Sequence, residues 1–161
     1  MKEYNTSTII PLNDEDIQQF FDSYPEVFEK NQPNAMEKKG LFLLGALVNS
    51  IVYAQYKKER NKTFLDKINY DGIKKEKVKK FINEIVEYLK IYSTADRPLL
   101  RYNQNTIAVV QESLINIEKS SLKKEEITFY ILLGNFVSSQ IHRKTSPSEE
   151  EQGGEEDDHS E

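Results

Sequence analysis

The fold of this chain is decided by the stretch GLFLLGALVNSIVYAQYKK, which spans Gly40–Lys58. The residues from Leu41 to Val48 are apolar apart from Gly45, so a helix here would be apolar around most of its surface. A bilayer span needs about 20 predominantly apolar residues, whereas Asn49 and Ser50 interrupt this run. The stretch therefore predicts a central helix that is buried against other helices on most sides.

A second apolar stretch repeats the first. The segment LLGALVNS at residues 43–50 aligns with LLGNFVSS at residues 132–139, and Gly45 then corresponds to Gly134. A glycine inside a helix costs about 1 kcal/mol relative to alanine, so two of them indicate a packing reason such as close approach of another backbone. We predict that the two helices cross at Gly45 and Gly134. A phosphate-binding loop is disfavoured, because no predicted strand precedes either glycine and no further glycines follow in the required pattern.

Composition is that of a charge-rich globular protein of one domain. The chain has 161 residues, of which 37% are hydrophobic and 30% charged, and it has no cysteine, which excludes disulfides and thiolate metal sites. The N-terminus has no apolar core of signal-peptide length, so we expect a cytoplasmic protein. The net charge of -5 is unevenly distributed along the chain. Residues 148–161 hold eight of the 27 acidic side chains and no lysine or arginine. Residues 1–147 therefore carry a net charge of +3.

Apolar periodicity predicts an all-α fold, a compact bundle of about five or six helices. Apolar residues recur at spacings of three and four over residues 74–92, 99–118 and 124–143, and no window alternates as a strand would. A short helix should follow Asn13 and end at Pro25, and Ser121 with a following glutamate should begin the last helix. The predicted organisation is a lead-in with a short helix (1–34), a helical bundle domain (35–144) and a disordered acidic tail (145–161).

No pattern in the sequence predicts an active site, a metal site or a cofactor. The two histidines are His142, at the expected end of the last helix, and His159, in the acidic tail. A cation at the end of a helix is the ordinary explanation for His142. The motifs of zinc hydrolases and of serine nucleophiles are absent from the sequence. We expect a protein that is not an enzyme.

The segment from residue 57 to residue 80 is strongly basic, with ten lysines and arginines against four acidic residues. Lysine and arginine contact phosphates without reading base sequence, and the tyrosines nearby can stack on unpaired bases. The alternative is a solvated charged face with no ligand. Under the first interpretation the phosphate contacts are Lys57, Lys58, Arg60, Lys62, Lys75 and Lys79.

Three segments together resemble a known family. The segments KGLFLLG (39–45), FLDKINYDG (64–72) and FYILLG (129–134) are similar to the C-terminal helical region of the large subunit of CRISPR type I-B Cascade complexes. Expressed alone, by internal translation initiation, that region is the small subunit of the complex. The resemblance covers residues 38–143.

The resemblance implies an all-helical, non-enzymatic subunit along the belly of an RNA-guided antiviral complex. Its partners would be the backbone and large subunits, copies of itself, and the guide RNA with both strands of the target DNA (the R-loop), held by charge; no membrane is involved. No catalytic residues carry over, and the acidic tail is not a feature of the family. The main alternative is a helical protein–protein adaptor with no nucleic-acid role. Recovery together with CRISPR subunits and guide RNA would distinguish the two.

The acidic tail generates a first prediction. If it competes with phosphate for the basic segment, truncation after Lys144 should tighten binding of single-stranded DNA by the isolated protein, because a short flexible tether supplies an effective concentration on the order of millimolar. The gain should shrink with salt, since the Debye length falls from about 30 Å at 0.01 M to about 8 Å at 0.15 M. Fluorescence anisotropy across that range measures it. A tail of equal length with its carboxylates changed to amides is the matched control, and superimposable curves would leave the tail as a solubilising segment.

Overall fold

The computed structural model describes residues 14–59, 73–93 and 97–145. Within these ranges the chain forms six α-helices, two short 3-10 helices and no strand, which confirms the predicted all-α bundle. The lead-in before residue 14, the segment 60–72 and the acidic tail after residue 145 lie outside the described residues. The elements are α2 (Asp14–Ser23), α3 (Pro25–Phe28), α4 (Ala35–Glu59), η2 (Lys75–Lys77), α6 (Val78–Ser93), α7 (Arg97–Ser113), η3 (Ile117–Lys119) and α8 (Lys124–Thr145).

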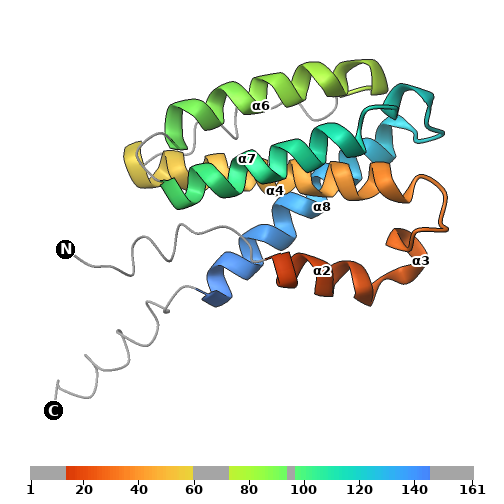
Figure 1. Cartoon of the computed structure of the whole chain (residues 1–161), viewed down its shortest axis with the longest axis horizontal. Helices are drawn as coiled ribbons and strands as arrows, with labels where there is room; N and C mark the ends of the chain where they lie inside the picture. The colour runs from red at the N-terminus through yellow and green to blue at the C-terminus, as the bar shows by residue number, and fades with distance from the viewer. Residues whose placement is uncertain (1–13, 60–72, 94–96, 146–161) are drawn as a thin grey trace, which may run out of the picture.

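Helix α4 is the central element, and the other helices surround it. Figure 1 shows α6 and α7 as an antiparallel pair on one side of α4, α2 with α3 on the other, and α8 crossing α4. The predicted burial on most sides of this helix is found, because six large side chains of α4 have an exposed fraction of at most 1%. They are Leu41, Phe42, Leu44, Leu47, Val48 and Ile51.

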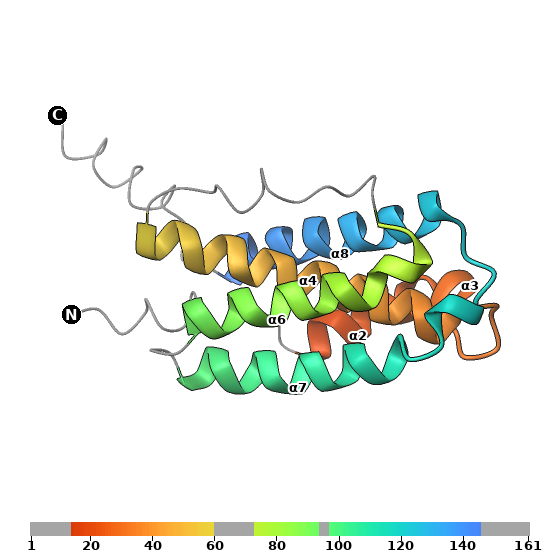
Figure 2. The ribbon, with the colours of Figure 1, turned by 90° about the horizontal axis from the view of Figure 1, so that it is seen from above.

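Helices α4 and α8 begin at the same end of the bundle. The side-chain amide of Asn34 donates a hydrogen bond to the hydroxyl oxygen of Ser121 (2.7 Å), which joins the residues just before each helix. From there both helices run in the same general direction and cross (Figures 1 and 2). The aligned repeats therefore come together in register.

The crossing brings the backbone of each helix against a glycine of the other. A Cβ on Gly45 would collide with the carbonyl oxygen of Ile131 and would lie 2.7 Å from the backbone nitrogen of Asn135. A Cβ on Gly134 would collide with the carbonyl oxygen of Phe42. The contact is reciprocal, because each carbonyl belongs to the residue three positions before the glycine of its own helix. No side chain larger than hydrogen fits at either position with the backbones in this arrangement.

Helices α2 and α3 contribute aromatic rings to the same core as α4. The ring centroids of Phe21 and Phe28 are 4.7 Å apart, and that of Phe21 lies 5.1 Å from Phe42. Pro25 ends α2, as expected, but it also begins α3, where the fixed φ of proline suits the first helical position. Ile17, Phe21 and Phe28, which fall in the predicted lead-in with its short helix, thus belong to the same buried cluster as the residues of α4.

One helix end and one capping residue differ from expectation, while α8 begins at Lys124 as predicted. Helix α7 ends at Ser113, and the chain continues through η3, which buries Ile117. At the start of α8 the carboxylate of Glu126 accepts a hydrogen bond from the backbone N–H of Lys123 (3.0 Å), the reciprocal half of a capping box. The predicted capping residue, Ser121, lies before this position and is instead bonded to Asn34.

The helix crossing predicts a loss of stability on adding one methyl group. Alanine at an open helical site would stabilise by about 1 kcal/mol relative to glycine. Because the added Cβ meets backbone, we expect Gly45→Ala and Gly134→Ala each to cost about 1 to 3 kcal/mol instead, and leucine at least as much. In a protein of this size each kcal/mol lowers Tm by about 2 to 4 °C, which thermal unfolding measures.

The matched control is Ala108→Leu on the exposed face of α7, which should leave Tm nearly unchanged. The double variant of Gly45 and Gly134 should cost less than the sum of the single ones, since the first substitution already separates the helices. Unchanged melting of both single alanine variants would contradict the backbone contact.

The raised pKa of Tyr130 in α8 predicts that the stability of the fold decreases at alkaline pH. Burial and, secondarily, the carboxylate of Glu126 raise the pKa of Tyr130 above its ordinary value. The protonated hydroxyl is therefore favoured in the folded state. The contribution of this ionisation to the free energy of unfolding is complete below about pH 10, the pKa of tyrosine in the unfolded chain. It is lost as pH rises through the pKa of Tyr130 in the folded state.

We expect Tyr130→Phe to remove this part of the alkaline loss. Urea unfolding from pH 7 to 11 should show a wild-type free energy of unfolding that falls more steeply above pH ~10 than that of the variant. Tyr24→Phe, at a ring that is 46% exposed, is the control for general effects of alkali. Parallel curves for wild type and the Tyr130 variant would contradict the assignment.

Candidate nucleic-acid interface

The basic residues that follow segment 60–72 lie on the surface, between and just after two buried apolar residues. Ile73 and Val78 are buried, with exposed fractions of 5% and 0%. The side chains between and just after them are largely in contact with solvent, because a short 3-10 turn and the first turn of α6 direct them outward. The exposed lysines of this part are Lys74, Lys77, Lys79 and Lys80.

Lys75, a predicted phosphate contact, is half-buried and has a structural bond. Its Nζ donates to the backbone carbonyl of Ser120 (2.7 Å), and the Ser120 hydroxyl in turn donates to the carbonyl of Ile117 (2.7 Å). These bonds tie η2 to η3, two short elements that are far apart in the sequence and in contact in space. Lys75 therefore holds the neighbouring lysines in position, and only its remaining N–H donors are left for a ligand.

The contact of η2 with η3 adds basic residues that the sequence interpretation left out. Lys119 belongs to η3 itself, and Lys123 and Lys124 follow it at the start of α8; all three are exposed. A signal was present in the sequence, since residues 119–124 contain three lysines and no acidic residue. We call the exposed lysines of the two segments the η2–η3 surface: Lys74, Lys77, Lys79, Lys80, Lys119, Lys123 and Lys124.

The other predicted phosphate contacts lie at the opposite end of the bundle or outside the described residues. Lys57 and Lys58 belong to the last turn of α4, whereas the η2–η3 surface lies near its first residue, because Ser120 adjoins the Asn34–Ser121 bond (Figure 2). An α-helix rises 1.5 Å per residue, so about 35 Å of α4 separates the two ends. Arg60 and Lys62 lie in the undescribed segment. The structure therefore divides the predicted basic segment between two ends of one helix.

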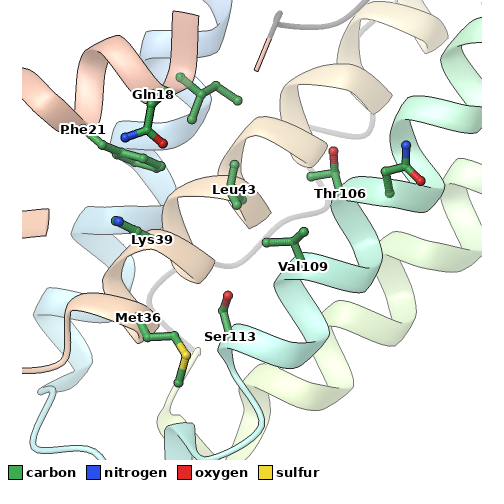
Figure 3. Close-up of a pocket in the computed structure, with 10 residues that line it drawn as sticks. Gln18, Phe21, Met36, Lys39, Leu43, Thr106, Val109 and Ser113 are labelled. Carbon is green, nitrogen blue, oxygen red and sulfur yellow. The ribbon is translucent and has the colours of Figure 1, made fainter. Parts of the chain in front are cut away.

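A hollow of about 370 Å³ opens between α2, α4 and α7 (Figure 3). Its lining is mainly apolar, and Lys39 is the one ionisable side chain among the described residues that form it. The Nζ of Lys39 lies 5.5 Å from the centroid of the Phe21 ring, within the range of a cation–π interaction. The lining residues are Ile17, Gln18, Phe21, Met36, Lys39, Leu43, Asn105, Thr106, Val109 and Ser113.

Because Lys39 is the one ionisable side chain among the described residues of the hollow, its lining holds no pair of acid and base groups. Three or more His, Cys, Asp or Glu side chains that could hold a metal ion do not meet anywhere in that part. None of its helices is long and apolar enough to cross a membrane. The chemistry that the described side chains offer is the positive charge of the η2–η3 surface and exposed apolar groups.

Comparison with known proteins gives one family. A family model described as the C-terminal domain of the CRISPR-associated protein TM1802 matches residues 1–149. No curated protein and no solved structure matches the chain. The family match includes every helix described above and stops within the acidic tail. The chain therefore belongs to the family of the TM1802 C-terminal domain, a family of CRISPR-associated proteins.

Proposed function

We propose that the chain is the non-catalytic small subunit of an RNA-guided CRISPR type I-B Cascade complex. It packs along the belly of the complex beside the backbone and large subunits and stabilises the bound target and displaced DNA strands through basic residues. Membership of a CRISPR-associated family supports the proposal that the chain acts together with other CRISPR-associated proteins. The observation that carries the nucleic-acid role is the presence of basic residues at both ends of α4.

The distance between the two basic ends suits contact along the backbone of a base-paired duplex. About 35 Å separates the ends of α4, and a duplex advances 3.4 Å per base pair, so one subunit would follow about ten base pairs. Lysines contact phosphates, which fixes position without reading bases. This is what a subunit needs when the guide RNA supplies the sequence recognition.

The phosphate contacts of this proposal remain Lys57, Lys58, Arg60, Lys62, Lys75 and Lys79, to which the η2–η3 surface adds its other lysines. Lys75 differs from the rest, because its Nζ is already bonded to Ser120. We therefore assign Lys75 a positioning role beside its charge, and the exposed Lys77 and Lys79 the direct contacts at this end.

A helical adaptor remains the alternative function. Exposed aromatic side chains on α8, at Phe129 and Phe136, favour a protein partner and are unrelated to phosphate binding. Affinity purification of the tagged full chain distinguishes the two functions. Recovery with CRISPR subunits and guide RNA supports the small subunit, and recovery with other proteins only would favour the adaptor.

The DNA role predicts a change in salt dependence. In the assembled complex, the pairs K57A/K58A and K77A/K79A should each flatten the slope of log K against log salt by about two units, at about one unit per lost phosphate contact. The two pairs should add, because they lie too far apart to share a contact.

The control for this experiment is K90A. Lys90 is exposed on α6 and paired with Glu87 (3.2 Å), so its loss should leave the slope unchanged. K75A is measured separately for Tm, since it removes the bond between η2 and η3. A complex that assembles with both lysine pairs removed and keeps the wild-type salt slope would contradict the assignment.

A further inference from the structure

The hollow between α2, α4 and α7 has apolar walls that the described residues leave partly uncovered. Met36 of α4 and Val109 of α7 line it, and their exposed fractions are 52% and 47%. Figure 3 shows Leu43 and Val109 directed into the space between the helices. Its volume of about 370 Å³ lies near the lower end of the range for ligand pockets, about 300–1,000 Å³. The hollow therefore has room for a few side chains.

The lining favours an aliphatic occupant over a charged one. Among the described residues that line the hollow, Lys39 alone is ionisable, and its Nζ already lies over the ring of Phe21. Most of the remaining wall is hydrocarbon, with Ile17, Leu43 and Val109 on three different helices. Aliphatic side chains placed against these walls would gain dispersion contacts and remove apolar surface from water.

The segment that precedes α2 has this chemistry and is within reach. Residues 9–12 read IIPL, four apolar residues in a row, and they end two positions before Asp14, the first residue of α2. Ile17 lies one helical turn further on, about 4.5 Å along the axis. An extended chain spans about 3.3–3.6 Å per residue, so residues 9–12 can reach the hollow without an intervening linker. The family match includes residues 1–13, so this segment belongs to the same domain as the helices.

The spacing of Leu12 and Ile17 is that of a hydrophobic staple. With Asp14 as the first residue of α2, Asn13 has the N-cap position, Leu12 directly precedes it, and Ile17 is the fourth helical residue. In a staple, the apolar residue before the N-cap packs against the fourth helical residue and fixes the angle at which the chain enters the helix. This pairing brings Leu12 to the α2 wall of the hollow.

Pro11 determines which neighbouring side chain accompanies Leu12. The residue before a proline is restricted to extended conformations, so the chain through Ile10 is extended. Alternate side chains of an extended segment point to the same side. Ile10 therefore shares a side with Leu12, and Ile9 points to the other side.

We propose that residues 9–12 of this chain close the hollow as an extended strap. Leu12 lies against Ile17 on the α2 wall, Ile10 reaches towards Val109 on the α7 wall, and Ile9 faces solvent. The strap joins α2 to α7 across α4, and it occupies the space that a small apolar ligand would otherwise take. The lead-in is then part of the packed domain.

Thiol labelling tests the strap directly, because the chain has no cysteine of its own. V109C places a single thiol on the α7 wall, at a position that is already 47% exposed. In the full-length protein, I10S/L12S should raise the rate at which a maleimide labels V109C by about tenfold, which corresponds to about 1.4 kcal/mol of docking free energy. The single variant I10S should raise this rate in the same direction.

The matched control is I9S, which makes the same chemical change at the adjacent position and should leave the labelling rate of V109C unchanged. I115C, at an isoleucine that is 60% exposed outside the hollow, reports any general loosening of the fold, and I10S/L12S should not change its labelling. A docked strap also stabilises the bundle, so I10S should lower Tm by about 2 to 4 °C, whereas I9S should not. Circular dichroism verifies that each variant is folded.

Equal labelling of V109C with and without I10S/L12S overturns the strap. Rapid labelling in both proteins means that the hollow is open, and slow labelling in both means that another molecule covers it. An I9S variant that accelerates labelling as much as I10S overturns the arrangement in which Ile10 and Leu12 share a side. These measurements use the isolated protein without DNA or CRISPR subunits, so their outcome is independent of the proposed function.

Discussion

The backbone contact between α4 and α8 at Gly45 and Gly134 is the constraint on which the other packing depends. Each glycine meets a carbonyl of the opposite helix, so the distance between the two helices is set by backbone atoms and not by adaptable side chains. Helix α4 can then direct its remaining apolar sides to the α6–α7 pair and to the aromatic rings of α2 and α3. A wider crossing would displace both of these layers, because protein interiors are packed nearly as densely as organic crystals.

Several features of the fold were predictable because they follow from the covalent sequence alone. The run around Leu44 is apolar on all sides, which only a central helix can accommodate, and Val78, Ile82 and Ile85 recur at helical spacing and are buried as that spacing predicts. The end of α2 was predictable from Pro25, which lacks the N–H that a continuing helix needs. Where backbone geometry or apolar periodicity decides the structure, a single sequence carries the information.

The arrangement of the charged residues was less predictable, because it depends on contacts between distant segments. Lys58 and Lys75 belong to one basic run in the sequence, yet the chain places them at opposite ends of α4. The hydrogen bond from Lys75 to Ser120 joins residues that are 45 positions apart, and no local sequence pattern predicts it. Lys119 was overlooked for the same reason, since its proximity to η2 arises only from the packing of the two 3-10 turns. A count of charges along the chain therefore located the basic residues but not the surfaces they form.

The long separation of the two glycines in the sequence has a consequence for synthesis. Gly134 follows Gly45 by 89 residues, so the segment that covers one side of α4 is among the last parts of the bundle to leave the ribosome. At translation rates of about 5–20 residues per second, Gly134 is synthesised roughly 4–18 s after Gly45. During that time the side of α4 that α8 later covers lacks its native partner and is open to non-native contacts, and the crossing can form only once the bundle is almost completely synthesised.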